Sequence, residues 1–117
     1  MEPEVKISIF DIVKTSTPEG RYEEDGQPAG ETVRRVINKN WVNYEKLVIS
    51  FDGIAKMTRV FVDEAFARLL EEHTLEEINQ KIFFPDAKEA IVKELNSAFK
   101  LRKKILASQK AREEGEL

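Results

Sequence analysis

The chain has 117 residues, 41% of them apolar and 35% charged, which suits one domain with a single core. A formal net charge of -3 excludes a global attraction to nucleic acid or to an anionic membrane. The sequence has no cysteine and one histidine, so disulfides and thiolate metal sites are excluded and we expect no cofactor. Without a signal-peptide pattern or an apolar run near the roughly 20 residues of a membrane span, we expect a cytoplasmic protein.

The first part of the chain predicts a strand, a long loop and a helix. Apolar residues alternate early in Val5–Val13, as in a half-buried strand. The segment Thr17–Glu31 holds three of the five glycines and two of the four prolines. It predicts a mobile loop or a loose hairpin that turns at Asp25-Gly26, with partner recognition as the alternative role. From Glu31 to Tyr44, apolar residues recur at helical spacing.

The middle of the chain predicts two further strands with helical segments between them. Lys46–Phe51 is a nearly continuous apolar run, typical of a strand covered on both faces. Val60–Glu72 carries a helical apolar stripe, and Thr58 is placed to cap its N-terminus. A helical turn over Leu75–Asn79 and a short strand over Lys81–Phe84 follow.

The last predicted helix is capped by Asp86 and loses its apolar stripe beyond Phe99. The run Lys100–Arg112 then holds six cations and no acid. We therefore expect a domain over residues 1–100 and a helical extension over 101–117 that is basic, then acidic and frayed. Strands that alternate with helices favour parallel pairing in a layered α/β domain.

Two segments of the chain resemble a known family. Phe-Asp-Gly-Ile follows the second predicted strand, Phe-x-Asp-Glu-x-Phe lies near the start of the next helix, and a Gly-Arg-Tyr segment lies upstream. Over roughly residues 18 to 100 the chain resembles STAS-like domains, the module shared by sulfate transporters and anti-sigma-factor antagonists. It is most similar to a bacterial branch of uncharacterised STAS-like proteins. The matching residues are Gly20, Arg21, Tyr22, Asp25, Gly26, Gly30, Glu31, Phe51, Asp52, Gly53, Ile54, Phe61, Asp63, Glu64 and Phe66.

The resemblance implies a fold and a mode of action. STAS-like domains are small layered β/α domains with a mixed, mostly parallel sheet and helices packed on one face. They bind a protein partner, commonly a histidine-kinase-like ATPase, and phosphorylation of a serine at the start of the second helix switches that binding. In this chain the serine position is Val60, which cannot be phosphorylated, so Thr58 is the nearest candidate phosphoacceptor.

For several candidate residues the sequence supports two interpretations of their role. Thr58 is either a phosphoacceptor or a plain N-cap. Asp63 and Glu64 are either partner contacts or charges that complement the helix dipole, and adjacent helix residues point too far apart to share a catalytic target. Asp52 lies where open α/β sheets place ligands, but Asp-Gly is also an ordinary turn.

We therefore expect a non-enzymatic protein-interaction module in bacterial regulation, acting on a partner such as a histidine-kinase-like ATPase. One alternative is an accessory nucleic-acid-binding protein that uses the basic C-terminal helix. An enzyme using Asp52, Asp63 or Glu64 would need a concave pocket with convergent polar groups. The expected contact residues of the interaction module are Thr58, Arg59, Phe61, Asp63 and Glu64, with Arg21, Tyr22 and Asp25 in the neighbouring loop.

Overall fold

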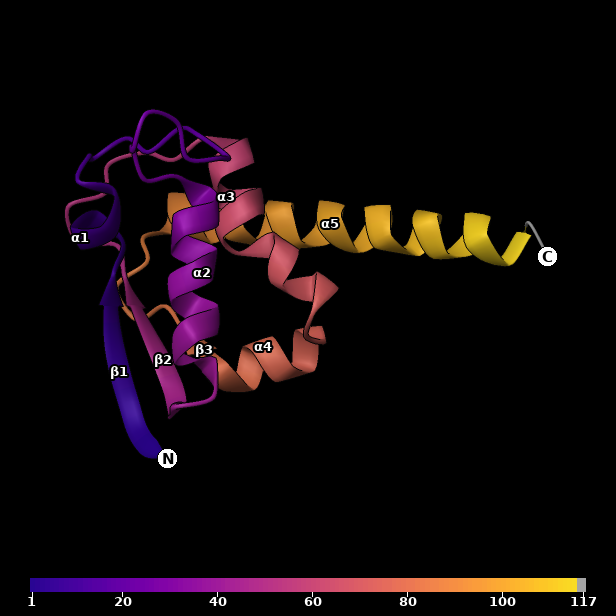
Figure 1. Ribbon diagram of the computed structural model, residues 1–117, viewed down its shortest axis with the longest axis horizontal. Coiled ribbons are helices and arrows are strands. Elements are labelled where there is room, and N and C mark those ends of the chain that lie inside the picture. The colour runs from indigo at the N-terminus through magenta and orange to yellow at the C-terminus, as the bar shows by residue number, and fades with distance from the viewer. Residues whose placement is uncertain (116–117) are drawn as a thin grey trace.

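The computed structural model describes residues 1–115 and shows one sheet of three parallel strands with helices packed beside it (Figure 1). The strands are β1 (Glu2–Ser8), β2 (Tyr44–Ser50) and β3 (Ile82–Phe83), in the order β1-β2-β3. Both pairings are parallel, with Ile7 opposite Ile49 in the first. The expected α/β class is confirmed, and within residues 1–115 the sheet is parallel throughout rather than mixed.

Helices make both crossovers between the strands. The short helix α1 and the longer α2 lie between β1 and β2, whereas α3, η1 and α4 lie between β2 and β3. The last helix runs past the body of the domain (Figure 1). The helical segments are α1 (Ile9–Val13), α2 (Gly30–Trp41), α3 (Arg59–Ala65), the 3₁₀ helix η1 (Ala67–Glu71), α4 (Leu75–Lys81) and α5 (Glu89–Gly115).

The sheet has one covered face and one bare face. Side chains alternate along each strand, so Leu47 and Ile49 of β2 are buried under the helices with Ile7 of β1. On the opposite face, Lys6 and Lys46 are exposed. Helices therefore cover one face, as the resemblance implies, and the domain has a single core.

The first strand ends where its alternating pattern fades, and one predicted helix is wrong in part. The strand that the pattern of Val5–Val13 predicts ends at Ser8, whose hydroxyl oxygen accepts a hydrogen bond from the Asp11 N–H and caps α1. The helix expected over Val60–Glu72 breaks at Phe66, whose backbone (φ -124°, ψ -52°) lies outside helical geometry, and continues as η1. At Ser8 a polar helix cap ends the strand, and at Phe66 a buried aromatic residue stands at the break in the helix. The apolar pattern of the sequence continues past both positions.

The predicted cap at Asp86 is also wrong. Its carboxylate accepts hydrogen bonds from the Phe51 N–H at 2.9 Å and the Ser50 hydroxyl at 2.6 Å. These bonds lower the pKa of Asp86, the backbone bond from Phe51 most. Asp86 therefore ties the turn between β3 and α5 to the end of β2, and α5 begins at Glu89.

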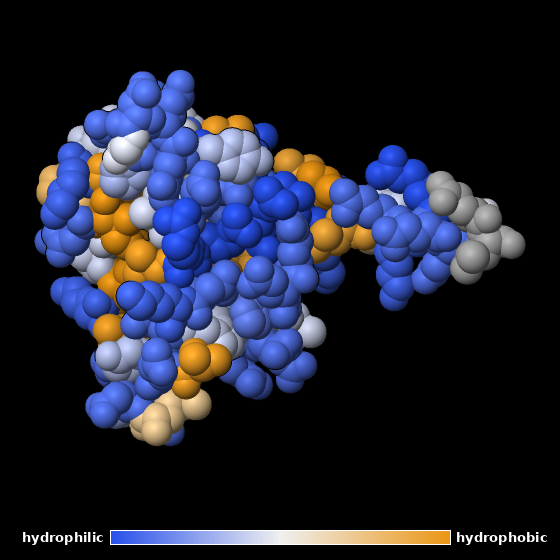
Figure 2. Space-filling view, viewed as in Figure 1, coloured by the Kyte–Doolittle hydropathy of each residue, from blue (hydrophilic) through white to orange (hydrophobic). Residues whose placement is uncertain are grey.

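The C-terminal part of α5 extends away from the core. Ile91 and Leu95 are buried, whereas residues 107–115 are exposed. Figure 2 shows apolar side chains gathered where α5 leaves the body and hydrophilic ones beyond. The helix is continuous to Gly115, and the final residues of the expected frayed end, 116–117, lie outside the described part. None of the helices in residues 1–115 combines the length and apolar character that a membrane span requires.

Close contact between α2 and α3 depends on Gly30. A Cβ at this position would lie 2.8 Å from the Cβ of Glu64 and 2.9 Å from the carbonyl oxygen of Phe61. We expect Gly30→Ala to force the two helices apart and to lower the free energy of unfolding by about 1–3 kcal/mol, measured by urea denaturation. Gly20→Ala is the control, because its added Cβ would meet atoms no closer than 3.7 Å. An unchanged urea midpoint for Gly30→Ala would contradict the requirement for this contact.

Candidate functional site

The loop between α1 and α2 is fixed by its own backbone. The carbonyl of Pro18 accepts from the Thr58 N–H at the start of α3, and the carbonyl of Gly20 accepts from the Gly30 N–H at the start of α2. Residues 18–21 of the loop therefore bridge the N-terminal ends of α2 and α3.

At the centre of this region lies the fully buried carboxylate of Glu64, whose side chain is 0% exposed. Its oxygens accept hydrogen bonds from Arg21 Nη1 at 2.9 Å, Arg34 Nη2 at 2.6 Å and Arg68 Nη1 at 3.2 Å. The three arginines come from the loop, from α2 and from η1. A carboxylate removed from water needs such partners, so Glu64 joins three elements to α3.

The neighbouring carboxylate, Asp63, joins the same assembly to α5. It accepts from Arg21 Nη1 at 2.7 Å and from Arg102 Nε at 3.0 Å, with a second bond from Arg102 Nη2. Burial alone would raise the pKa of Asp63, but the hydrogen bonds from Arg102 and Arg21 outweigh it and lower the pKa. Two parallel bonds from one guanidinium also fix its orientation.

A further pair closes the assembly on its outer side. Arg68 donates two bonds to Glu71, at 2.9 and 3.0 Å, and this hydrogen bonding lowers the pKa of Glu71 and raises that of Arg68. We call these side chains the arginine–carboxylate network: Arg21, Arg34, Asp63, Glu64, Arg68, Glu71 and Arg102.

Thr58 connects the start of α3 to the fixed loop. Its hydroxyl oxygen accepts from the Phe61 N–H at 3.2 Å, so the predicted N-cap is confirmed. The same hydroxyl donates to the carbonyl of Glu19 at 2.6 Å. Thr58 therefore caps α3 and also holds the loop against the start of that helix.

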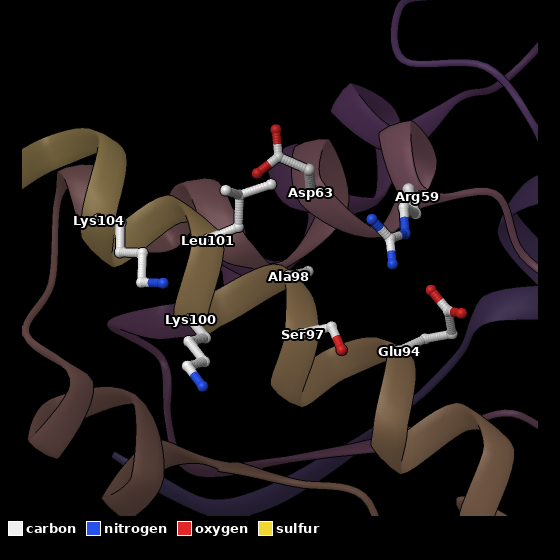
Figure 3. A pocket seen from close by; sticks show the side chains of 8 residues that line it. All are labelled: Arg59, Asp63, Glu94, Ser97, Ala98, Lys100, Leu101 and Lys104. Carbon is white, nitrogen blue, oxygen red and sulfur yellow. The ribbon is translucent and has the colours of Figure 1, made fainter.

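A groove lies between α3 and the middle of α5, with a volume of about 320 Å³ (Figure 3). In Figure 3 the side chains of Arg59 and Glu94 point toward one another across its opening, and Leu101 points toward α3. We call it the α3–α5 groove. Its lining residues are Arg59, Asp63, Glu94, Ser97, Ala98, Lys100, Leu101 and Lys104.

The structure separates the predicted contact residues by exposure. Phe61 and Glu64 are fully buried, so neither can touch a partner unless the fold opens, and both act from beneath the surface. Arg59, Tyr22 and Asp25 are exposed. The others are half-buried and engaged within the fold, namely Arg21, Thr58 and Asp63.

Three of the network's arginines are absent from the residues predicted from sequence. Arg68 was detectable, because it stands four residues after Glu64 on the same helical face. Arg34 and Arg102 lie 30 and 39 residues from the carboxylates they bind. Such distant pairs have no local signal, since only the packing of helices brings them together.

Asp52 lies apart from the network. It is exposed in a turn where the Ile54 N–H donates to the Phe51 carbonyl and Gly53 has φ 87°, so the turn reading is confirmed. The hollows that Asp52 lines contain neither Asp63 nor Glu64. Within residues 1–115, no three or more His, Cys, Asp or Glu side chains group in a way that could hold a metal ion.

Comparison with known families agrees with this architecture. A family model described as a STAS-like domain of unknown function (DUF4325) matches residues 29–92, from the start of α2 to the first turn of α5. No curated protein and no solved structure matches the chain. The expected STAS-like resemblance is confirmed. Arg21 and Arg102, which both bind Asp63, lie outside the matched segment.

The ion pairs of Asp63 predict a pH-dependent stability. Because its pKa is lowered in the fold from the usual 3.8, its contribution is complete above that value and is lost as the pH falls through the folded pKa. We expect Asp63→Asn to cost about 2 kcal/mol at pH 7 and to differ little from the original chain near pH 2. Urea denaturation between pH 7 and pH 2 measures this difference.

The matched control for this prediction is Asp25→Asn, the same change in an exposed turn. Its difference from the original chain should stay small at every pH. A cost of Asp63→Asn that is equally large at pH 2 and pH 7 would show that the ion pairs are not its source.

Proposed function

The chain belongs to the STAS-like domain family of unknown function, and on that premise we propose that it is a non-catalytic protein-interaction module in bacterial regulation. Its partner would be a regulatory protein such as a histidine-kinase-like ATPase or an anti-sigma-type protein. Docking would occur at the N-terminal end of α3 and the fixed loop beside it.

The observation that carries this proposal is a rigid surface with exposed contact groups. The arginine–carboxylate network and the hydrogen bond from Thr58 to the Glu19 carbonyl hold the loop, α2, α3 and α5 in one arrangement. Over this support, Arg59 is exposed and the apolar Val60 is 44% exposed. A preorganised surface that presents an arginine beside an apolar side chain suits protein recognition, because little ordering remains to be done on binding.

The state of the carboxylates supports binding rather than chemistry. Every oxygen of Asp63 and Glu64 accepts from an arginine. The hydrogen bonds from Arg102 and Arg21 lower the pKa of Asp63, so this carboxylate is a weak base. The side chain of Glu64 is fully buried. Asp52 opens on a different hollow, so the three acids considered for an enzyme do not converge on one pocket.

Thr58 offers a means of control at the same surface. A phosphate on its hydroxyl would remove the bond to the Glu19 carbonyl and place negative charge beside Arg59. Phosphorylation would thereby loosen the loop and change the charge of the docking face. Thr58 would in this way take the role that Val60 cannot take.

The docking face predicts the effect of Arg59→Glu. The partner is first captured from the native host on the tagged chain, identified by mass spectrometry and purified. We expect Arg59→Glu to weaken its binding by about tenfold or more, equivalent to about 1.4 kcal/mol, in isothermal titration calorimetry. The fold should survive, because an acidic residue suits the first turn of a helix. Lys93→Glu, on the exposed side of α5, is the control, and equal binding by all three proteins would refute the docking face.

The proposed control by Thr58 predicts a difference between two substitutions. Thr58→Ser keeps a hydroxyl that caps α3 and can donate to Glu19, so partner affinity should remain within about twofold. Thr58→Asp also caps the helix but adds a charge and cannot donate to the carbonyl. We expect it to weaken the purified partner's binding about fivefold or more, and equal affinities of the two variants would argue against the switch.

A further inference from the structure

We infer that the α3–α5 groove receives an acidic amphipathic helix of the partner protein, an inference that rests on the proposed function and names the partner's chemistry. The groove has an apolar floor and exposed cations at its rim.

The floor of the groove is an apolar strip on α5. Leu101 is 53% exposed, and Ala98 and Ile105 beside it are half-buried. Their spacing of three and then four residues places them on one side of the helix. Figure 2 shows apolar side chains exposed in this part of α5. An exposed strip of this kind, next to a second helix, matches the way grooves receive the apolar face of an amphipathic helix.

The length of the groove suits a short helix. The lining of α5 from Glu94, with Ile105 extending the strip, covers about 16 Å at 1.5 Å per residue. A partner helix laid along it would make contact through roughly three turns. This is enough for apolar anchors at positions i, i+3, i+4 and i+7.

The rim of the groove is positively charged. Arg59, Lys100 and Lys104 are exposed, and among the ion pairs within residues 1–115 none involves these three. Asp63, one of the two acids in the lining, is already neutralised by Arg102 and Arg21. The lining therefore carries three exposed cations, with Glu94 as the one remaining acid. Acidic residues flanking an apolar face would complement this rim.

The same features favour a protein over a nucleic acid. A phosphate backbone would pair with the lysines but would leave Leu101 and Ala98 without a contact. The groove lining also contains no aromatic side chain on which a base could stack. The apolar floor therefore favours an amphipathic helix, and the exposed cations favour one whose polar side is acidic.

The test uses two synthetic peptides of about 14 residues, made only of leucine and glutamate and identical in composition. In the first, the leucines stand at i, i+3, i+4 and i+7 and form a stripe; in the second, the same residues are rearranged so that no stripe forms. Each fluorescent peptide is titrated with the full chain and its anisotropy is measured. We expect the striped peptide to bind at least about tenfold more tightly than the rearranged one.

Substitutions locate the binding to the groove. Leu101→Ser and Lys104→Glu should each weaken the striped peptide by about fivefold or more. The controls are Val42→Ser, which changes an apolar residue that is 73% exposed after α2, and Lys110→Glu, which reverses an exposed charge on α5 beyond the groove. Both controls should bind the peptide as the original chain does.

The following results would overturn the inference. Equal binding of both peptides would mean that charge alone attracts them, and an unchanged affinity of Leu101→Ser would place the peptide elsewhere. A single-stranded DNA oligonucleotide that displaces the peptide, and whose own binding is lost in Lys104→Glu but not in Leu101→Ser, would assign the surface to nucleic acid. A purified native partner that depends on Arg59 but not on Leu101 would reject the groove and leave the proposed function intact.

Discussion

The structure depends on one buried charge, the carboxylate of Glu64. A fully buried carboxylate is tolerated only where hydrogen-bond donors surround it, and here Arg21, Arg34 and Arg68 meet that requirement. Because these arginines come from a loop, from α2 and from η1, satisfying one side chain fixes three elements around α3. The close approach this requires is possible because Gly30 presents no Cβ toward Glu64.

The network also links the core to the surface. Asp63 stands next to Glu64 in sequence but faces α5, where Arg102 binds it. Arg21 contacts both carboxylates and so joins the buried centre to the edge of the α3–α5 groove. The ion pairs that engage both carboxylates therefore also hold α3 and α5 together, the two helices whose exposed groups the proposed binding uses.

Much of the fold could be predicted from the sequence because its signals are local. The apolar spacing of α2, the apolar run of β2 and the cap at Thr58 all involve residues within a few positions of one another, and the structure contains each of them. Predictions from local signals were wrong where a contact between residues distant in the sequence determined the structure. Asp86 has the form of a helix cap, yet its carboxylate binds Ser50 and Phe51 at the end of a strand.

The sequence by itself determined the alternation of strands and helices, the family and the acidic pair that draws attention to α3. Apolar periodicity, helix caps and short motifs each involve neighbouring positions. They can therefore be recognised in the sequence before the packing of the helices is known. Only the tertiary structure decided the roles of that pair. Glu64 is buried and Asp63 is clamped because Arg34 and Arg102, 30 and 39 residues away, reach them once the helices pack. Residues this far apart in the chain meet only through the fold, so the groove that places Arg59 beside Leu101 was visible only once that packing was known.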